Sequence, residues 1–256
     1  MIQLSVNLNK IALVRNSRLG DTPSVLAAAE SVIRAGANGI TVHPRPDQRH
    51  IRPDDVYQLS SLLKNKYPDI EFNIEGNPTA GPRDNGYPGF DALIESTRPH
   101  QCTLVPDGDE QLTSDHGWDL TVHAESVARM IEKYHGWNAR VSLFMDPDES
   151  QIALASEIGA DRIELYTGPF AETVRQFGVE ASESLTSLAL YAAAAQYASQ
   201  LGLGVNAGHD LDLQNLPLFR SISEVAEVSI GHALISDALN MGLFDTVRDY
   251  LQALED

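Results

Sequence analysis

Several short apolar runs in this sequence end in side chains that can move protons or bind anions. One run ends at His43 and leads into a loop with Arg45, Arg49 and His50. Histidine exchanges protons near neutral pH, and arginine binds phosphate or carboxylate through paired hydrogen bonds. Because the chain has only 18 lysine and arginine residues in total, two arginines beside a histidine favour an anion site over a solvated basic loop.

Two later runs end in a glycine followed by a histidine. One reads Asn206-Ala-Gly-His-Asp210, which includes His209, and the other ends at Gly231 and His232. Glycine lets backbone N–H groups approach an anion closely, and a helix N-terminus favours negative charge. Both pairs therefore predict phosphate binding. A metal site is the alternative, but the sequence lacks His-x-His and His-Glu-x-x-His spacings, so no metal is predicted.

Carboxylates lie within two other runs. Glu71 and Glu75 are four residues apart, so they would share one face of a strand and project into the interior. Glu164 has a similar place in a later run. A buried carboxylate is costly and often marks a group with a functional pKa. Pairing with an arginine is the structural alternative for each of them.

The first run supplies Asn7, Asn9 and Lys10, and Arg18 follows shortly after. Asparagine amides can orient hydroxyl or carbonyl groups of a substrate. Lys10 is expected to act as a plain cation for a phosphate, with Schiff-base formation as the alternative.

The arrangement of eight such runs predicts the fold that brings these residues together. Helix-like stretches separate the runs, which begin about every 30 residues, as in a (β/α)8 TIM barrel. We therefore predict an α/β fold with one TIM-barrel domain over 1–256, with extra helices inserted at 122–134 and 171–177. An open doubly wound sheet is the alternative, but no Gly-x-Gly-x-x-Gly follows the first run. The runs span residues 3–9, 39–43, 70–75, 101–106, 141–146, 162–167, 202–209 and 228–232.

Composition narrows the class of protein. The formal net charge is −18, which disfavours nucleic acid and anionic membrane surfaces as partners. No apolar stretch approaches the roughly 20 residues that span a bilayer, and the N-terminus has no signal-peptide pattern, so we expect a cytoplasmic protein. The single cysteine, Cys102, cannot form an internal disulfide and is expected to be a buried thiol.

The motifs, taken in order, resemble the pyridoxine 5'-phosphate synthase family from Leu4 to about Leu251. Its members are TIM barrels with extra helices that form dimers and often octamers. They condense 3-amino-2-oxopropyl phosphate with 1-deoxy-D-xylulose 5-phosphate to pyridoxine 5'-phosphate, phosphate and water, without a metal or organic cofactor. The segments that carry the resemblance are Val6-Asn-Leu-Asn-Lys10, Arg15-Asn-Ser-Arg18, Gly39-Ile-Thr-Val-His-Pro-Arg45, Arg49-His50, Ile70-Glu71, Leu104-Val-Pro106, Val141-Ser-Leu-Phe144, Ile163-Glu-Leu-Tyr-Thr-Gly168, Val205-Asn-Ala-Gly-His209 and Ile230-Gly-His-Ala233.

The resemblance implies a role for each site residue. It makes His43 and Glu71 proton acceptors and His209 the proton donor. Residues expected to hold the aminoketone phosphate are Asn7, Arg18, Asp210, Gly231 and His232. Those expected to hold the deoxyxylulose phosphate are Asn9, Lys10, Arg45, His50 and Thr113. Glu164 is added to the substrate-binding residues as an inward carboxylate. A lid is expected at Asp107–Gly117, because imine formation must exclude water.

Three features depart from the family pattern. Asn9-Lys10 stands where Asp-His is common, Asp210 stands where glycine is usual, and the loop Gly76–Phe90 is longer than in many relatives. Two other functions remain as alternatives: a different phosphosugar barrel enzyme, such as an epimerase or aldolase, and a non-catalytic barrel that binds phosphorylated metabolites.

Overall fold

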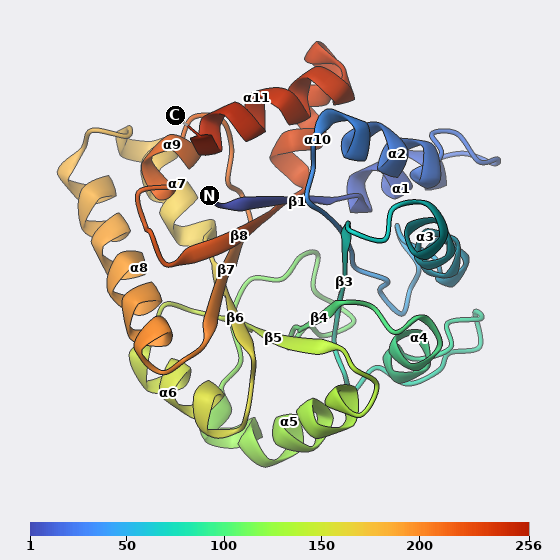
Figure 1. Cartoon of the computed structure of the whole chain (residues 1–256), viewed down its shortest axis with the longest axis horizontal. Coiled ribbons are helices and arrows are strands. Elements are labelled where there is room, and N and C mark those ends of the chain that lie inside the picture. Colours follow the sequence, from blue (N-terminus) through green and yellow to red (C-terminus); the bar gives the residue numbers. More distant parts are fainter. Residues whose placement is uncertain (256) are drawn as a thin grey trace.

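Eight parallel strands form a closed barrel in the computed structural model, which describes residues 1–255 (Figure 1). Each strand pairs with the next along the chain, and β8 closes the barrel against β1. This confirms the predicted (β/α)8 fold and places the carboxyl ends of all strands at one rim. The strands are β1 (Gln3–Asn7), β2 (Gly39–Val42), β3 (Glu71–Gly76), β4 (Gln101–Leu104), β5 (Arg140–Met145), β6 (Arg162–Tyr166), β7 (Gly204–Gly208) and β8 (Val225–Ile230).

Helices surround the barrel on the outside (Figure 1). The insertion predicted at 171–177 is confirmed as α7, which precedes the longer α8. The insertion predicted at 122–134 is wrong: within the described chain α5 is the one helix between β4 and β5, and the extra length is a loop at 105–119. The helices are α1 (Asn9–Asn16), α2 (Val25–Ala35), α3 (Pro53–Lys66), α4 (Phe90–Thr97), α5 (Leu120–His135), α6 (Glu149–Glu157), α7 (Gly168–Phe177), α8 (Ser182–Gln200), α9 (Leu216–Phe219), α10 (His232–Met241) and α11 (Leu243–Glu255).

Local sequence signals set the helix ends, as α2 illustrates. The Ser24 hydroxyl accepts a hydrogen bond from the Ala27 N–H at the start of the helix. Gly36 ends it at φ 113°, a left-handed conformation that glycine adopts without a steric penalty. The next strand, β2, follows within three residues, so this stop fixes the start of the strand that leads to His43.

The apolar core is a shell between the strands and the helices. Alternate residues of each strand point outward and are buried against helical side chains. Typical pairs on one strand are Leu4 and Val6 of β1, Ile40 and Val42 of β2, and Phe72 and Ile74 of β3, each at most 2% exposed. None of the helices in residues 1–255 is long and apolar enough to cross a membrane.

The inside of the barrel is polar, whereas valine, isoleucine and leucine usually fill it. The hydroxyls of Ser5 and Thr41 lie 2.7 Å apart, and the Asn73 amide donates to Thr41 Oγ1. Thr103 on β4 donates to Glu164 on β6 at 3.4 Å, a contact across the interior between strands that are not neighbours. Hydrogen bonds rather than apolar packing therefore organise the space beneath the rim.

Candidate active site

A cavity of about 440 Å³ opens at the carboxyl ends of the strands. It brings together twelve of the fourteen residues that the sequence predicted for the site. These are Asn7, Asn9, Lys10, His43, Arg45, His50, Thr113, Glu164, His209, Asp210, Gly231 and His232. Glu71 and Arg18 are not among its lining residues.

Glu71 lies at the opposite end of the barrel. It is the first residue of β3 and pairs with Gly39, the first residue of β2. Its carboxylate accepts a hydrogen bond of 2.6 Å from Arg140 at the start of β5. The structure therefore places Glu71 in an arginine pair outside the cavity lining, and the proton-acceptor role that the resemblance implies for it stays a prediction. Glu75, near the other end of β3, lines the cavity instead.

Arg18 also lies apart from the cavity. It follows α1 and is exposed, and its predicted contact with a substrate stays a prediction. Arg15, one turn earlier, is buried and binds Asp55 through two hydrogen bonds of 2.5 and 2.9 Å. That pair ties α1 to α3.

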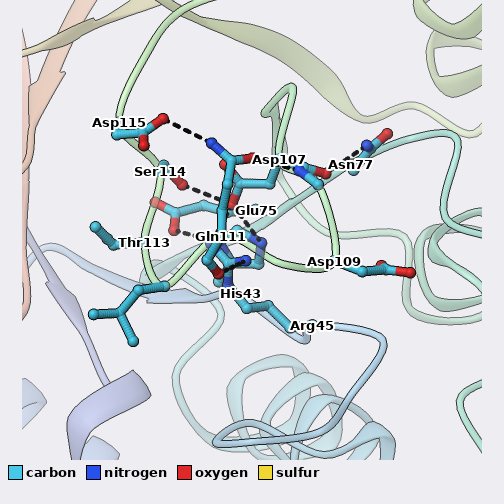
Figure 2. A network of polar contacts seen from close by, with 12 residues as sticks. His43, Arg45, Glu75, Asn77, Asp107, Asp109, Gln111, Thr113, Ser114 and Asp115 are labelled. Atoms are coloured by element: carbon cyan, nitrogen blue, oxygen red, sulfur yellow. Dashed lines mark hydrogen bonds and ion pairs between the residues drawn. The ribbon is translucent and has the colours of Figure 1, made fainter.

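His43 stands between two carboxyl groups at the base of the cavity (Figure 2). Its Nδ1 is 3.8 Å from Glu75 Oε2, and its Nε2 is 3.7 Å from Asp107 Oδ2. Asp107 forms an ion pair with Arg45 and accepts a hydrogen bond of 2.8 Å from the Ser114 hydroxyl. Sequence reasoning did not assign Asp107 to the site, although it directly follows the predicted strand end at Pro106.

Burial sets the protonation states of this cluster. It raises the pKa of Glu75 to about 8, with the charge of Asp107 adding to the effect. It lowers the pKa of His43 well below its usual value, and nearby Arg45 lowers it further. At neutral pH Glu75 therefore keeps its proton while His43 is a neutral imidazole. The cluster thus holds a proton donor and a proton acceptor side by side, as general acid–base catalysis requires.

Cationic groups gather on one side of the cavity. Lys10, Arg45 and Arg49 all line it, and burial together with Arg45 lowers the pKa of Lys10. Burial and Arg45 also lower the pKa of His50 to about 3, so its ring is neutral. His50 Nδ1 accepts a hydrogen bond from the Ile51 N–H, which leaves Nε2 as a donor. In a chain with a net charge of −18, this concentration of donors is suited to an anion.

Two asparagines, Asn7 at the end of β1 and Asn9 at the start of α1, connect the ends of the first three strands. Asn7 donates to Glu75 Oε2 at 3.2 Å, and its amide oxygen accepts a hydrogen bond from the Asn9 N–H. The Asn9 amide oxygen accepts a hydrogen bond of 2.8 Å from the His43 N–H. These contacts position His43 and Glu75.

The wall of the cavity at the ends of β7 and β8 has little room for additional side-chain atoms. A Cβ on Gly231 would lie 3.0 Å from Asn7 Cβ, and a Cβ on Gly208 would lie 2.4 Å from Glu164 Oε1. Burial raises the pKa of Glu164 well above its usual value, so this carboxyl is neutral too. Because α10 begins at His232 beside the cavity, its first turn can offer N–H groups to a phosphate.

The loop at 105–119, which contains the lid predicted at Asp107–Gly117, forms part of the cavity wall. Leu112, Thr113 and Ser114 line the cavity from this loop. Arg49 donates to the Gln111 carbonyl at 2.9 Å and to the Leu112 carbonyl at 3.2 Å. The lid is therefore fastened to the basic loop that follows β2.

The long loop at 76–90 contacts the same lid. The sequence alone had predicted no role for this loop. Asn77 donates to the Asp107 carbonyl at 2.7 Å, and Arg83 pairs with Asp109 at 2.8 Å. Between this loop and the lid lies a second cavity of about 240 Å³. Among residues 1–255, no three histidine, cysteine or acidic side chains gather in a way that would hold a metal ion.

Comparisons with known proteins show the family of this chain. A family profile described as "Pyridoxal phosphate biosynthesis protein PdxJ" matches residues 4–256. A protein of Xanthomonas campestris pv. campestris (strain B100) named pyridoxine 5'-phosphate synthase is 57% identical over 249 residues, which cover 97% of this chain and 94% of that protein. A protein of the same name from Xylella fastidiosa (strain M23) is 54% identical over 254 residues, covering 99% and 95%.

Solved structures with low sequence identity share the fold alone. The 3-hexulose-6-phosphate synthase from Salmonella typhimurium matches with a TM-score of 0.63 at 14% identity, covering 99% of both chains. Tryptophan synthase from M. tuberculosis matches with a TM-score of 0.62 at 11% identity, covering 100% of this chain and 94% of the other.

Proposed function

The chain belongs to the family of pyridoxal phosphate biosynthesis protein PdxJ, and from this we infer that it is a pyridoxine 5'-phosphate synthase of vitamin B6 biosynthesis. The reaction joins 3-amino-2-oxopropyl phosphate to 1-deoxy-D-xylulose 5-phosphate and releases phosphate and water. Apart from family membership, the main support for this proposal is the protonation pattern of the cavity. There Nδ1 of the neutral His43 lies 3.8 Å from Oε2 of the protonated Glu75.

Ring closure of this kind needs several proton transfers around one bound intermediate. An amine condenses with a ketone, a carbon–carbon bond forms, and water and phosphate leave. In our proposal His43 accepts protons, while Glu75, which holds a proton at neutral pH, and His209 donate them. These three side chains line one cavity of about 440 Å³. Successive proton transfers can therefore act on one bound intermediate before it is released.

Two phosphorylated substrates require two anion sites. The donors of Lys10, Arg45 and His50 form one candidate, and the start of α10 with Gly231 and His232 forms the other. Both candidates line the same cavity as His43 and Glu75, so the reactive carbons of the two substrates would meet beside that cluster. We propose no organic cofactor and no metal for this chemistry.

The proposal is tested by giving the purified protein both substrates and measuring pyridoxine 5'-phosphate and released phosphate. His43→Gln should lower kcat by about 10²–10⁴-fold, the usual contribution of a general base. His135→Gln is a matched control, because His135 is exposed on α5 and pairs with Asp161. Absence of product from fresh substrates would refute the synthase. A borohydride-trapped adduct on Lys10 would instead indicate imine chemistry of an aldolase.

We also propose that the protein works in the cytoplasm as a homo-oligomer. Cys102 is a buried free thiol, compatible with a reducing compartment. The neighbouring helices α1 and α10 expose Val14, Leu239 and Met241, between 38% and 80% accessible, and such apolar surface is typical of a subunit contact. Light scattering of the purified chain distinguishes an oligomer from a monomer.

A further inference from the structure

His209 is held between a carboxylate and a hydroxyl. Its Nδ1 lies 2.9 Å from Asp210 Oδ2, and its Nε2 lies 2.8 Å from Thr113 Oγ1 on the lid. The hydrogen bond from His209 lowers the pKa of Asp210, so this carboxylate is ionised and can only accept. When the ring carries a single proton, that proton therefore lies on Nδ1, and Nε2 accepts from the Thr113 hydroxyl.

The backbone that carries this pair is constrained. His209 and Asp210 have φ values of 87° and 59°, a left-handed region that non-glycine residues adopt infrequently. The buried Thr167 hydroxyl donates to the Gly208 carbonyl at 2.7 Å and to the His209 carbonyl at 2.5 Å. Asn215 donates to the Asp210 carbonyl at 3.1 Å. Hydrogen bonds on both sides therefore hold the turn that places the carboxylate against the imidazole.

Asp210 was expected to contact a substrate phosphate. A carboxylate repels phosphate, whereas an acceptor on one ring nitrogen fixes the tautomer and orientation of a catalytic histidine. The contact between the Asp210 carboxylate and His209 Nδ1 is of the kind that orients a histidine.

We propose that Asp210 is a positioning residue for His209. Its carboxylate keeps the ring proton on Nδ1 and leaves Nε2 at the cavity, where Thr113 occupies it until a substrate group replaces the hydroxyl. The Nε2 atom can then exchange a proton with that group, and Asp210 stabilises the imidazolium while His209 carries the second proton. This inference rests on the proposed function, because the exchange serves the proton-donor role assigned to His209.

The first test reads the tautomer in ligand-free protein and so does not depend on activity. The ¹⁵N signals of His209, identified by their loss in His209→Asn, are measured at about pH 9, where unperturbed imidazoles are neutral. Wild type should show hydrogen on Nδ1 and none on Nε2. In Asp210→Gly the glycine can adopt the left-handed backbone conformation of this position. This variant should lose the preference for hydrogen on Nδ1 of His209. Hydrogen on Nε2 in wild type would overturn the proposal.

The second test separates positioning from substrate contact. Asp210→Gly should lower kcat by roughly tenfold, the lower range for loss of an orienting partner, and leave both KM values within about twofold. Asp210→Asn keeps an oxygen acceptor and should lose less. Raised KM with unchanged kcat, or equal losses in the two variants, would overturn the orienting role. Glu125→Ala, which removes a carboxylate that is 90% exposed on α5, should match wild type.

If wild type makes no pyridoxine 5'-phosphate, the proposed function fails, but the tautomer measurement still decides whether Asp210 orients His209.

Discussion

Replacing Glu75 by glutamine should stabilise the protein at alkaline pH. The glutamine side chain has nearly the same shape and can still accept the hydrogen bond from Asn7, but it cannot ionise. In the folded chain burial raises the pKa of Glu75 to about 8, against 4.5 for an ordinary glutamate. Between these two values the unfolded chain has released this proton and the folded chain still holds it.

The sign of the effect follows from that difference. The unfolded state binds fewer protons than the folded state over this range, so the free energy of unfolding falls as pH rises. Glu75 therefore contributes its full stability below about pH 4.5 and loses that contribution as pH rises to about 8. Each pH unit in this window lowers the free energy of unfolding by about 1.4 kcal/mol, which gives an upper figure of about 3 kcal/mol between pH 5.5 and pH 8.

Urea unfolding of wild type and Glu75→Gln at pH 5.5, 7 and 8 measures the effect. The free energy of unfolding of wild type should fall more steeply, so that the variant gains roughly 1–3 kcal/mol relative to wild type over the series. Burial raises the pKa of Glu227 in both proteins. The charge of Glu75 adds to the raised pKa of Glu164, so the variant loses part of that shift and its pH profile becomes flatter still. Parallel pH profiles for the two proteins would refute the reasoning that Glu75 is buried in its protonated form.

Three further changes test other parts of the structure. Glu71→Gln should leave kcat within about threefold of wild type, because Glu71 lies outside the cavity; a loss of about 10²-fold, as for an acid–base residue, would contradict this placement. Arg15→Ala should lower the free energy of unfolding, measured by urea unfolding, by about 3–5 kcal/mol, because it leaves the buried Asp55 carboxylate without its arginine partner. A loss under about 1 kcal/mol would count against a stabilising role for this pair. Arg83→Ala should raise KM up to about fivefold with unchanged thermal stability, because its exposed ion pair with Asp109 supports the lid, and an unchanged KM would argue against the support.

The barrel could be predicted because its signals are periodic. Alternating burial places Leu4 and Val6 outside and Ser5 inside, and each helix stop, such as Gly36, precedes a strand directly. Histidines and glycines at the ends of such strands must meet at one rim, so most of the cavity residues followed from the strand pattern alone.

The differences between prediction and structure have separate causes. Glu71 and Glu75 share a face of β3, and Glu75 is the later residue of that strand, so the strand direction places Glu75 nearer the rim, whereas the family resemblance pointed to Glu71. Arg15 and Arg18 are both basic residues of one segment, but only the tertiary contact with Asp55 shows that Arg15 is structural. Asp107 follows a proline in a polar stretch, and its place beside His43 depends on how that loop folds back over the barrel.

The separation of an apolar shell from a polar interior has a consequence for how this barrel can change over time. Stability comes mainly from residues such as Val6 and Ile74, which face the helices, while Thr103 and Glu164 face the interior and make no part of that shell. Substitutions among the interior residues can therefore accumulate without emptying the hydrophobic core. A lineage with this design can explore new reactions inside an inherited scaffold, and a protein engineer can redesign the interior and leave the outer layer untouched.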